Sequence, residues 1–126
     1  MLLRIAHAQI LIPAGREDEA RRFYCGVLGL HEIEKPEALR VRGGLWLAVG
    51  EAQQLHVGVE RGEWRDRAGS REHLAYEVDD VEAARARLEA AGVAVKMGAG
   101  DAVPGYRRCE LRDPFGNRIE LMSRSG

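Results

Sequence analysis

Four side chains that can bind a divalent metal occur at two matched places in a repeated sequence pattern. His7 and His73 lie in similar short segments roughly 65 positions apart, and His56 and Glu120 lie in a second such pair with about the same separation. Neutral imidazole nitrogens and carboxylate oxygens are ligands that borderline divalent ions accept in proteins. A lone histidine in a strand more often makes an ordinary hydrogen bond, but four donors at repeated positions favour a shared metal site.

The sequence between these donors is repeated as well. Residues 19–30 begin with Glu-Ala-Arg-Arg and end with Leu-Gly-Leu, and residues 82–93 begin with Glu-Ala-Ala-Arg and end with Ala-Gly-Val. Small differences in spacing are expected from insertions in loops, because loops absorb length changes at little cost. The chain, residues 1–126, is therefore interpreted as a single domain made of two copies of one unit, about 1–60 and 72–126, joined by a linker over 61–71.

The first copy begins with a strand-like segment over residues 4–12, which ends at a proline and a glycine. From about residue 17 to residue 28 the apolar residues recur at helical spacing, and Gly29 suits the end of a helix. Short segments typical of strands follow, separated by proline and glycine, at 31–33, 39–41, 45–49 and 53–59. The pattern predicts the order βαβββ.

The second copy repeats this order. Residues 79–80 are two aspartates that suit the N-cap of a helix over 81–91, whose composition favours helix. The predicted strands are 74–78, 93–96, 106–112 and 118–122, with a glycine-rich loop over 97–105. Asp-Pro and Gly-Asn within residues 113–117 are a strong signal for a turn between the last two strands. Neither copy alone can cover its sheet, so the two are expected to complete one another.

Alternation of side chains across a strand groups the candidate residues on common faces. His7 shares its face with Gln9, and His56 lies on the matching face of the last strand of the first copy. The duplication assigns corresponding faces to His73 and Glu120. Curved sheets of this order are expected to bring these faces into one concavity.

Composition excludes several classes of protein. The chain has 126 residues and 45% hydrophobic content, enough for one domain with a real core, and a formal net charge of −1 that offers no patch for nucleic acid. No apolar run approaches the roughly 20 residues that span a membrane, and the first residues do not resemble a secretion signal. Cys25 and Cys109 lack a metal or redox spacing, which suggests a reducing compartment. A cytoplasmic protein is predicted.

The chain also resembles the vicinal oxygen chelate superfamily, which includes glyoxalase I, fosfomycin-resistance thiol transferases, extradiol dioxygenases and bleomycin-resistance proteins. The motifs that carry the resemblance are the segments 19–30, 44–47, 73–80 and 113–121, the last reading Asp-Pro-Phe-Gly-Asn-Arg-Ile-Glu-Leu. The resemblance covers almost the whole chain. It implies an α+β fold, in which two tandem βαβββ modules form an open, cupped mixed β-sheet around one divalent metal ion: Zn, Ni, Mn or Fe.

The resemblance supports the four candidate ligands unequally. His7, His73 and Glu120 match the ligand positions of the superfamily. His56 is a departure, because metal-using glyoxalase I has a carboxylate from this strand, placed a few residues earlier, and fosfomycin-resistance proteins use only three protein ligands. The internal repeat nevertheless sets His56 opposite Glu120, so His56 is kept as a fourth candidate ligand.

The resemblance also implies a mechanism. Enzymes of the superfamily let a substrate with two adjacent oxygens chelate the metal, which acts as a Lewis acid. A glyoxalase-like reaction also needs a carboxylate that moves a proton between two carbons. Glu120 is the first candidate for this base if, as the resemblance implies, it loosens from the metal when substrate binds, and Glu110 is the second. A surface ion pair with Arg108 or Arg112 is an equally good explanation of Glu110.

Three residues are candidates for substrate binding. Trp46 matches an aromatic residue that lines the cavity in the fosfomycin-resistance branch, although a position in the core would suit it equally. Arg108 falls on the same face of its strand as Glu110, and we expect it to bind an anionic or polar substrate group. Gln9 is the third candidate, because it shares the face of His7.

Three functions remain open for a protein whose expected partner is a small molecule. A metal-dependent isomerase or lyase of glyoxalase type accounts for all four candidate ligands. A ring-cleaving extradiol dioxygenase needs two histidines and one carboxylate around iron(II), which three histidines fit less neatly. A metal-free protein that binds an antibiotic needs no ligands at all. A homodimer is expected, with modules paired within one chain or exchanged between two.

Overall fold

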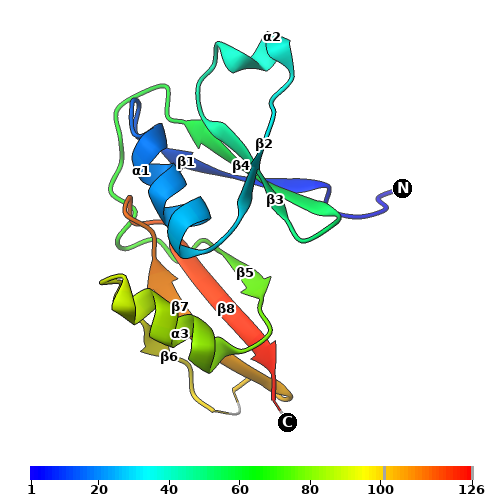
Figure 1. The fold of residues 1–126 in the computed structure, drawn as a ribbon, viewed down its shortest axis with the longest axis vertical. Helices are drawn as coiled ribbons and strands as arrows, with labels where there is room; N and C mark the ends of the chain where they lie inside the picture. The colour runs from blue at the N-terminus through cyan, green and yellow to red at the C-terminus, as the bar shows by residue number, and fades with distance from the viewer. Residues whose placement is uncertain (101, 126) are drawn as a thin grey trace. The chain divides into compact units, whose positions relative to one another are not determined.

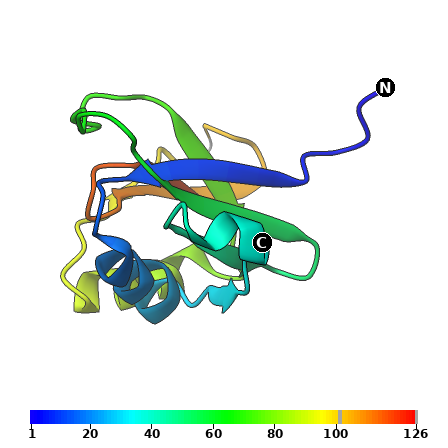
Figure 2. The same ribbon diagram turned by 90° about the horizontal axis from the view of Figure 1, so that it is seen from above.

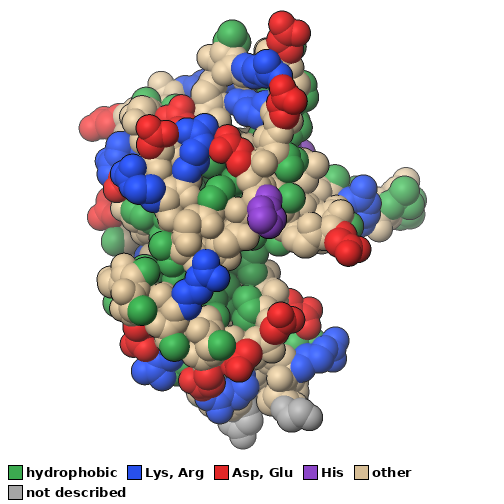
Figure 3. Space-filling model, in the orientation of Figure 1, with side chains coloured by type: hydrophobic (Ala, Val, Ile, Leu, Met, Phe, Trp, Pro, Cys, Tyr) green, Lys and Arg blue, Asp and Glu red, His purple; other side chains and the backbone are tan. Residues whose placement is uncertain are grey.

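The computed structural model describes residues 1–100 and 102–125, which form two compact units (Figure 1). The first unit covers Met1–Arg65 and the second begins at Asp66. The boundary between them falls inside the segment 61–71 that the sequence marks as a linker. Figure 3 shows basic and acidic side chains interspersed on one face, as the small net charge leads one to expect.

Each unit contains one four-stranded mixed sheet. The first sheet has the order β1-β4-β3-β2 and the second has the order β5-β8-β7-β6, so the two orders correspond strand for strand. In both sheets the first and last strands of the unit run parallel, and the other neighbours are antiparallel. The strands are β1 (His7–Ile12), β2 (His31–Ile33), β3 (Leu45–Val49), β4 (Gln53–Val59), β5 (His73–Glu77), β6 (Lys96–Met97), β7 (Tyr106–Arg112) and β8 (Arg118–Arg124). The predicted α+β class and the duplicated modules are confirmed.

The helix of each unit follows its first strand. In the first unit α1 (Glu17–Arg21) continues into a π-helical segment, η1 (Arg22–Val27), where the backbone N–H of Leu28 donates to the carbonyl of Phe23 at 2.9 Å. Figure 2 shows this helix on one side of β1. In the second unit α3 (Val81–Ala90) begins at Asp80, whose side chain accepts hydrogen bonds from the backbone N–H groups of the first turn. This is the N-cap that the paired aspartates predict.

The sequence prediction was wrong for the segment 39–41. Residues Glu37–Arg40 form a short helix, α2, instead of a strand. Pro36 is the N-cap residue, with φ −52° and a non-helical ψ of 139°, and its carbonyl accepts from the N–H of Leu39 at 2.9 Å. The four residues that follow it are good helix formers. A run of three residues is too short to show whether its hydrophobic period is that of a helix or a strand. The helix propensity of residues 37–40 was more informative here.

Other differences concern the ends of elements. The first strand begins at His7 instead of residue 4, the strand predicted over 93–96 is shifted to Lys96–Met97, and the last strand extends to Arg124. The predicted loop over 97–105 includes Asp101, which lies outside the described residues. These shifts do not move any candidate site residue off its strand.

Alternation along the strands separates the core from the site. In the first unit the fully buried positions of β3 and β4 include Leu45, Leu47 and Leu55. Trp46 lies between Leu45 and Leu47, and Gln54 directly precedes Leu55. Both are half-buried, and alternation assigns them to the opposite face of the sheet. Among the described residues no helix has the length and apolar character that crossing a bilayer requires.

Candidate functional site

Three aromatic rings stack on one face of the first sheet. Strand register sets His56 of β4 beside Gln9 of β1 and beside Trp46 of β3. The rings of His7 and His56 stack with centroids 4.0 Å apart and planes at 17°, and the rings of Trp46 and His56 stack at 4.0 Å and 4°. His56 is therefore the middle ring, held between a second imidazole and an indole. The common face predicted for His7, Gln9 and His56 is confirmed for the first unit, and the structure adds Trp46 to it.

The hydrogen bond of His56 determines which of its nitrogens carries a proton. The side chain is only 6% exposed, and its Nε2–H donates to Oε1 of Gln54 at 2.9 Å. An amide oxygen can only accept, so Nε2 holds the proton and Nδ1 keeps its lone pair. Burial lowers the pKa of His56, and the neighbouring charges of His7 and Lys35 lower it further. Both effects favour the neutral imidazole, which is the form that can bind a metal.

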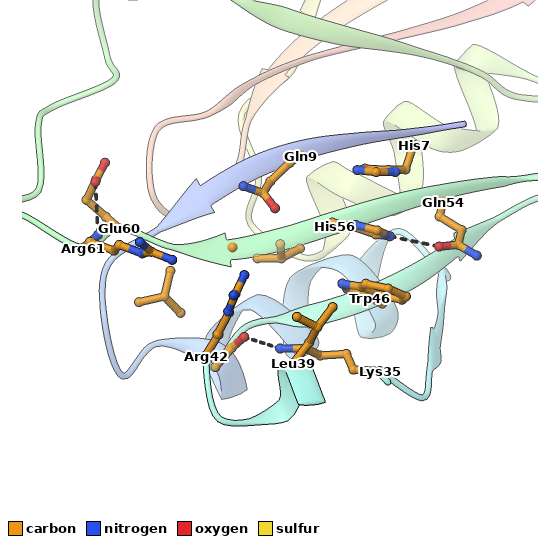
Figure 4. A pocket seen from close by; sticks show the side chains of 14 residues that line it. His7, Gln9, Lys35, Leu39, Arg42, Trp46, Gln54, His56, Glu60 and Arg61 are labelled. Carbon is orange, nitrogen blue, oxygen red and sulfur yellow. Dashed lines mark hydrogen bonds between the residues drawn. The ribbon is translucent and has the colours of Figure 1, made fainter. Parts of the chain in front are cut away.

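The stack borders a cavity of about 630 Å³ (Figure 4). Its volume lies in the range of cavities that hold small organic molecules. Gln9 and Trp46, both expected to contact a substrate, line this cavity. Lys35, Arg42 and Arg61 line it as well, and sequence reasoning did not single them out. They lie in loops or just beyond a strand, where no periodicity shows which way a side chain points.

A glycine near the end of β4, Gly58, lines this cavity. A Cβ atom at Gly58 would lie 3.0 Å from Cδ of Gln9 and 3.1 Å from Cδ2 of Leu11. The missing side chain therefore leaves room for Gln9. Sequence reasoning overlooked Gly58, although a glycine inside a strand is itself a signal that something approaches the backbone closely.

The second unit repeats the strand register of the first. His73 of β5 lies beside Arg118 of β8, two residues before Glu120, just as His7 of β1 lies beside the residue two before His56. Glu110 of β7 lies beside Glu120, as Trp46 lies beside His56. The structure therefore confirms that the four candidate ligands occupy matched positions in the repeat.

His73 also has one nitrogen committed to a hydrogen bond. Its Nδ1–H donates to the backbone carbonyl of Arg71 at 2.9 Å. A carbonyl is only an acceptor, so Nδ1 carries the proton and Nε2 keeps its lone pair. Histidines that bind metals in proteins usually donate their other N–H to an oxygen in this way, which fixes the tautomer and orients the ring.

The carboxylates of the second unit are paired with arginines from neighbouring strands. Arg108 donates from Nε to Oε1 of Glu120 at 2.9 Å, and its Nη2 donates to the same oxygen. Glu110 accepts from Nη2 of Arg118 at 2.6 Å, and so it pairs with neither arginine that the sequence suggested. Arg112 instead donates to backbone carbonyls of nearby loops. Arg108, which we expected to meet the substrate, is held by a candidate metal ligand.

The donor set fits a divalent ion in its chemistry. His56 and His73 each use one ring nitrogen as a donor and keep the other as an acceptor. Both hydrogen bonds from Arg108 reach Oε1 of Glu120, and a carboxylate that binds a metal is commonly hydrogen-bonded as well. Within the part of the chain that the structure describes, no three His, Cys, Asp or Glu side chains are gathered as a metal-binding group. The four candidates are divided evenly between the two units, with His7 and His56 in the first.

Comparisons with known proteins agree with the duplicated fold. The sequence model of the Glyoxalase/Bleomycin resistance protein/Dioxygenase superfamily matches residues 4–121. A crystal structure from Bacillus anthracis, described as a glyoxalase family protein, is 38% identical with a TM-score of 0.88, and the match covers 99% of this chain and 98% of that one.

Two further solved structures share the fold. TnmS3, an antibiotic binding protein from Streptomyces sp. CB03234, is 28% identical with a TM-score of 0.67, and the match covers 98% of this chain and 100% of that one. A glyoxalase/dioxygenase from Nostoc punctiforme, at 21% identity and a TM-score of 0.75, covers 98% of this chain and 92% of its own, and shows the shared fold alone. No functionally curated protein matches the chain. From its motifs, its paired modules and these relatives, the chain belongs to the glyoxalase/bleomycin resistance protein/dioxygenase superfamily, which is the vicinal oxygen chelate superfamily.

Proposed function

We propose that the chain is a metal-dependent enzyme of glyoxalase type, an isomerase or lyase that acts on a small molecule with two adjacent oxygen atoms. The proposed ligands of one divalent ion, Zn, Ni, Mn or Fe, are His7, His56, His73 and Glu120. The observation that carries the proposal is the hydrogen bonding of His56 and His73. Each ring donates one N–H to an oxygen, which leaves the second nitrogen available as a ligand.

Each residue near the proposed metal would have a separate role in the reaction. A bound divalent ion supplies Lewis-acid stabilisation of negative charge on substrate oxygens. Glu120 is the proposed base: it would loosen from the metal when substrate binds, accept a proton from one substrate carbon and return it to the next. Arg108, bonded to Oε1 of Glu120, would position that carboxylate. Glu110 is the second candidate for the base, although Arg118 holds it in this structure.

The proposed substrate contacts lie in the first unit. Gln9 and Trp46 line the cavity beside the stacked rings. The amide of Gln9 can donate and accept hydrogen bonds, so it suits the oxygens of a chelating substrate. Trp46 offers apolar surface, and its position on the cavity favours this role over the alternative of a core tryptophan.

Metal content provides the first test of the proposal. We expect the purified protein to contain a stoichiometric divalent ion by inductively coupled plasma mass spectrometry, and His73→Ala and Glu120→Ala to lose it. His31→Ala is a suitable control, because His31 is an exposed histidine on β2 that is not a proposed ligand. A protein that takes up no divalent ion, and whose behaviour is unchanged by the two ligand variants, would overturn the metal-dependent proposal.

The rate then tests the role of Arg108. With hemithioacetals as substrates, Arg108→Ala should lower kcat while metal content stays normal, because Arg108 touches Glu120 through Oε1 only. Arg107→Ala is its control. Arg107 is the neighbouring residue on β7, and its side chain pairs with Glu82 instead. Equal kinetics for both variants would remove Arg108 from the mechanism.

A metal-free binding protein is the second candidate, and one observation favours it. The stacked rings of Trp46, His56 and His7 border a cavity large enough for a drug-sized molecule, and a relative at 28% identity is described as an antibiotic binding protein. Binding of a small molecule that persists in the presence of a chelator, without turnover, would support this candidate. Iron in the purified protein would instead direct assays to catechols and a ring-cleaving dioxygenase. We also expect a homodimer, which light scattering at micromolar concentration can test.

A further inference from the structure

Positive charge is concentrated around the cavity of the first unit. Lys35, Arg42 and Arg61 line it, and Glu60 is the one carboxylate among its described lining residues, although the chain as a whole has a net charge of −1. Lys35 donates from Nζ to the backbone carbonyl of Gly43. Among the described residues, no ion pair or side-chain hydrogen bond engages the guanidinium of Arg42 or that of Arg61.

Local structure explains why these cations meet at one cavity. After α2, the N–H of Arg42 donates to the carbonyl of Leu39 at 3.2 Å, and two glycines with positive φ return the chain to β3. This tight turn holds Arg42 against the site. On the other side, the N–H of Glu60 donates to the carbonyl of Ile12 at 2.9 Å. That bond continues the pairing of β1 with β4 up to the residue before Arg61.

The side chains converge in Figure 4. Arg42 extends from its loop toward β4, on the side of the cavity where Gln9 and Arg61 lie, and the stack of Trp46 and His56 forms the neighbouring wall. Guanidinium and ammonium groups only donate hydrogen bonds, so the group that complements them is an anion rich in acceptors. A hollow lined by one sign of charge also concentrates ligands of the opposite sign.

We propose that this cavity binds a small molecule whose carboxylate or phosphate group is held by Arg42 and Arg61, with an unsaturated or aromatic portion beside Trp46. Lys35 adds charge to the same cavity. The inference rests on the proposed function, since it names the substrate class of that same site. Arg42 and Arg61 take the role of anion binding that the sequence had suggested for Arg108, which the structure pairs with Glu120.

The test compares charged and uncharged probes of similar shape. Isothermal titration calorimetry would use the full chain with 2-naphthoate, 2-naphthyl phosphate and uncharged 2-naphthamide. A chelator is present throughout, so that no anion binds through a metal. We expect at least one anion to bind roughly tenfold more tightly than the amide, because a hydrogen bond to a charged group contributes enough for about that factor. This preference should weaken as salt is added.

Variants then locate the anion. Arg42→Ala and Arg61→Ala should each weaken anion binding about tenfold and leave amide binding unchanged. Arg40→Ala is the matched control, because Arg40 lies on the same segment but pairs with Glu34. Trp46→Leu should weaken all probes by a similar factor. Equal affinity for the anions and the amide, no binding of any probe, or an anion preference that survives both arginine variants would overturn the inference.

Metal content measured on the same samples separates this inference from the proposed function. Arg42→Ala and Arg61→Ala should retain the metal content of the parent, since neither is a proposed ligand. A chain that prefers the anionic probes but takes up no divalent ion would refute the metal-dependent enzyme and leave the anion site standing. A chain that binds metal but shows no preference for anions would refute the anion site and leave the metal-dependent enzyme standing.

Discussion

The turn that brings the chain into β3 depends on a glycine at residue 44. Gly44 has φ +81°, and a Cβ atom there would lie 2.2 Å from the carbonyl oxygen of Val57 on β4. Close carbon–oxygen contacts in proteins are normally about 3.3 Å or longer, so the added carbon would have to displace the backbone of β4 by about 1 Å. Gly44→Ala therefore perturbs the pairing of the two strands that carry Trp46 and His56.

The expected loss of stability has two parts. A left-handed conformation costs a residue with a Cβ about 1–2 kcal/mol, and forcing an extra carbon against packed structure costs about 1–3 kcal/mol. Gly44→Ala should therefore lower the free energy of unfolding by about 2–5 kcal/mol. Gly50→Ala separates the two parts, because Gly50 has φ +61° but a Cβ there would meet nothing within 4 Å. It should lose only the conformational part, about 1–2 kcal/mol.

Urea unfolding followed by tryptophan fluorescence is the appropriate assay. Trp46 and Trp64 both lie in the first unit, and so the signal reports on the unit that contains Gly44 and Gly50. The unfolding midpoint should fall further for Gly44→Ala than for Gly50→Ala, with similar slopes for both variants. If both variants lose the same free energy to within about 0.5 kcal/mol, β4 yields to the added carbon without cost. In that case the contact with Val57 does not constrain the turn.

Two further predictions concern stability in each unit. Asp113 is 5% exposed, and its Oδ1 accepts from the backbone N–H groups of Phe115 and Asn117 at 2.9 and 2.8 Å. Asp113→Ala should therefore lower the free energy of unfolding by about 2–4 kcal/mol, measured by urea unfolding followed by circular dichroism. A loss below about 1 kcal/mol would show that other groups satisfy these donors. Burial, and then the charge of His7, lower the pKa of His56 in the folded chain. Protonation of His56 therefore favours unfolding. The stabilising effect of the neutral ring is complete above about pH 6.5 and is lost as the pH falls through the folded-state pKa. His56→Gln should therefore reduce the decline of unfolding free energy between about pH 7 and pH 5, and a decline as steep as that of the parent would contradict this assignment.

Local sequence patterns were sufficient where the interactions that stabilise an element are themselves local. The helix at Val81–Ala90 follows its capping aspartate, and the turn over residues 113–117 is closed by the side chain of its own first residue. Both depend on hydrogen bonds between residues a few positions apart, which composition can reveal. The segment 39–41 was misassigned because three apolar or basic residues carry no measurable period, and the helix there begins two residues earlier, after Pro36 as its N-cap.

The internal duplication also made strand register predictable from the sequence. Because both units have the same register, the positions of His56 and Glu120 in the repeat correctly indicated matched places in two sheets. Alternation then placed His7 and Gln9 on a common face, as observed in the first unit. A periodic pattern can assign a face in this way since the backbone of a strand directs every second side chain to the same side.

By itself, the sequence determined the family, the two modules and the identity of the candidate ligands. Only the tertiary structure decided which side chains touch: the stack of His56 between His7 and Trp46, the pairing of Arg108 with Glu120, and the cations around the cavity. Each of these contacts joins residues that are distant in sequence or belong to irregular loops. Several arginines were equally placed to reach a given carboxylate, and the choice among them depends on register and on side-chain conformation, which no one-dimensional pattern specifies.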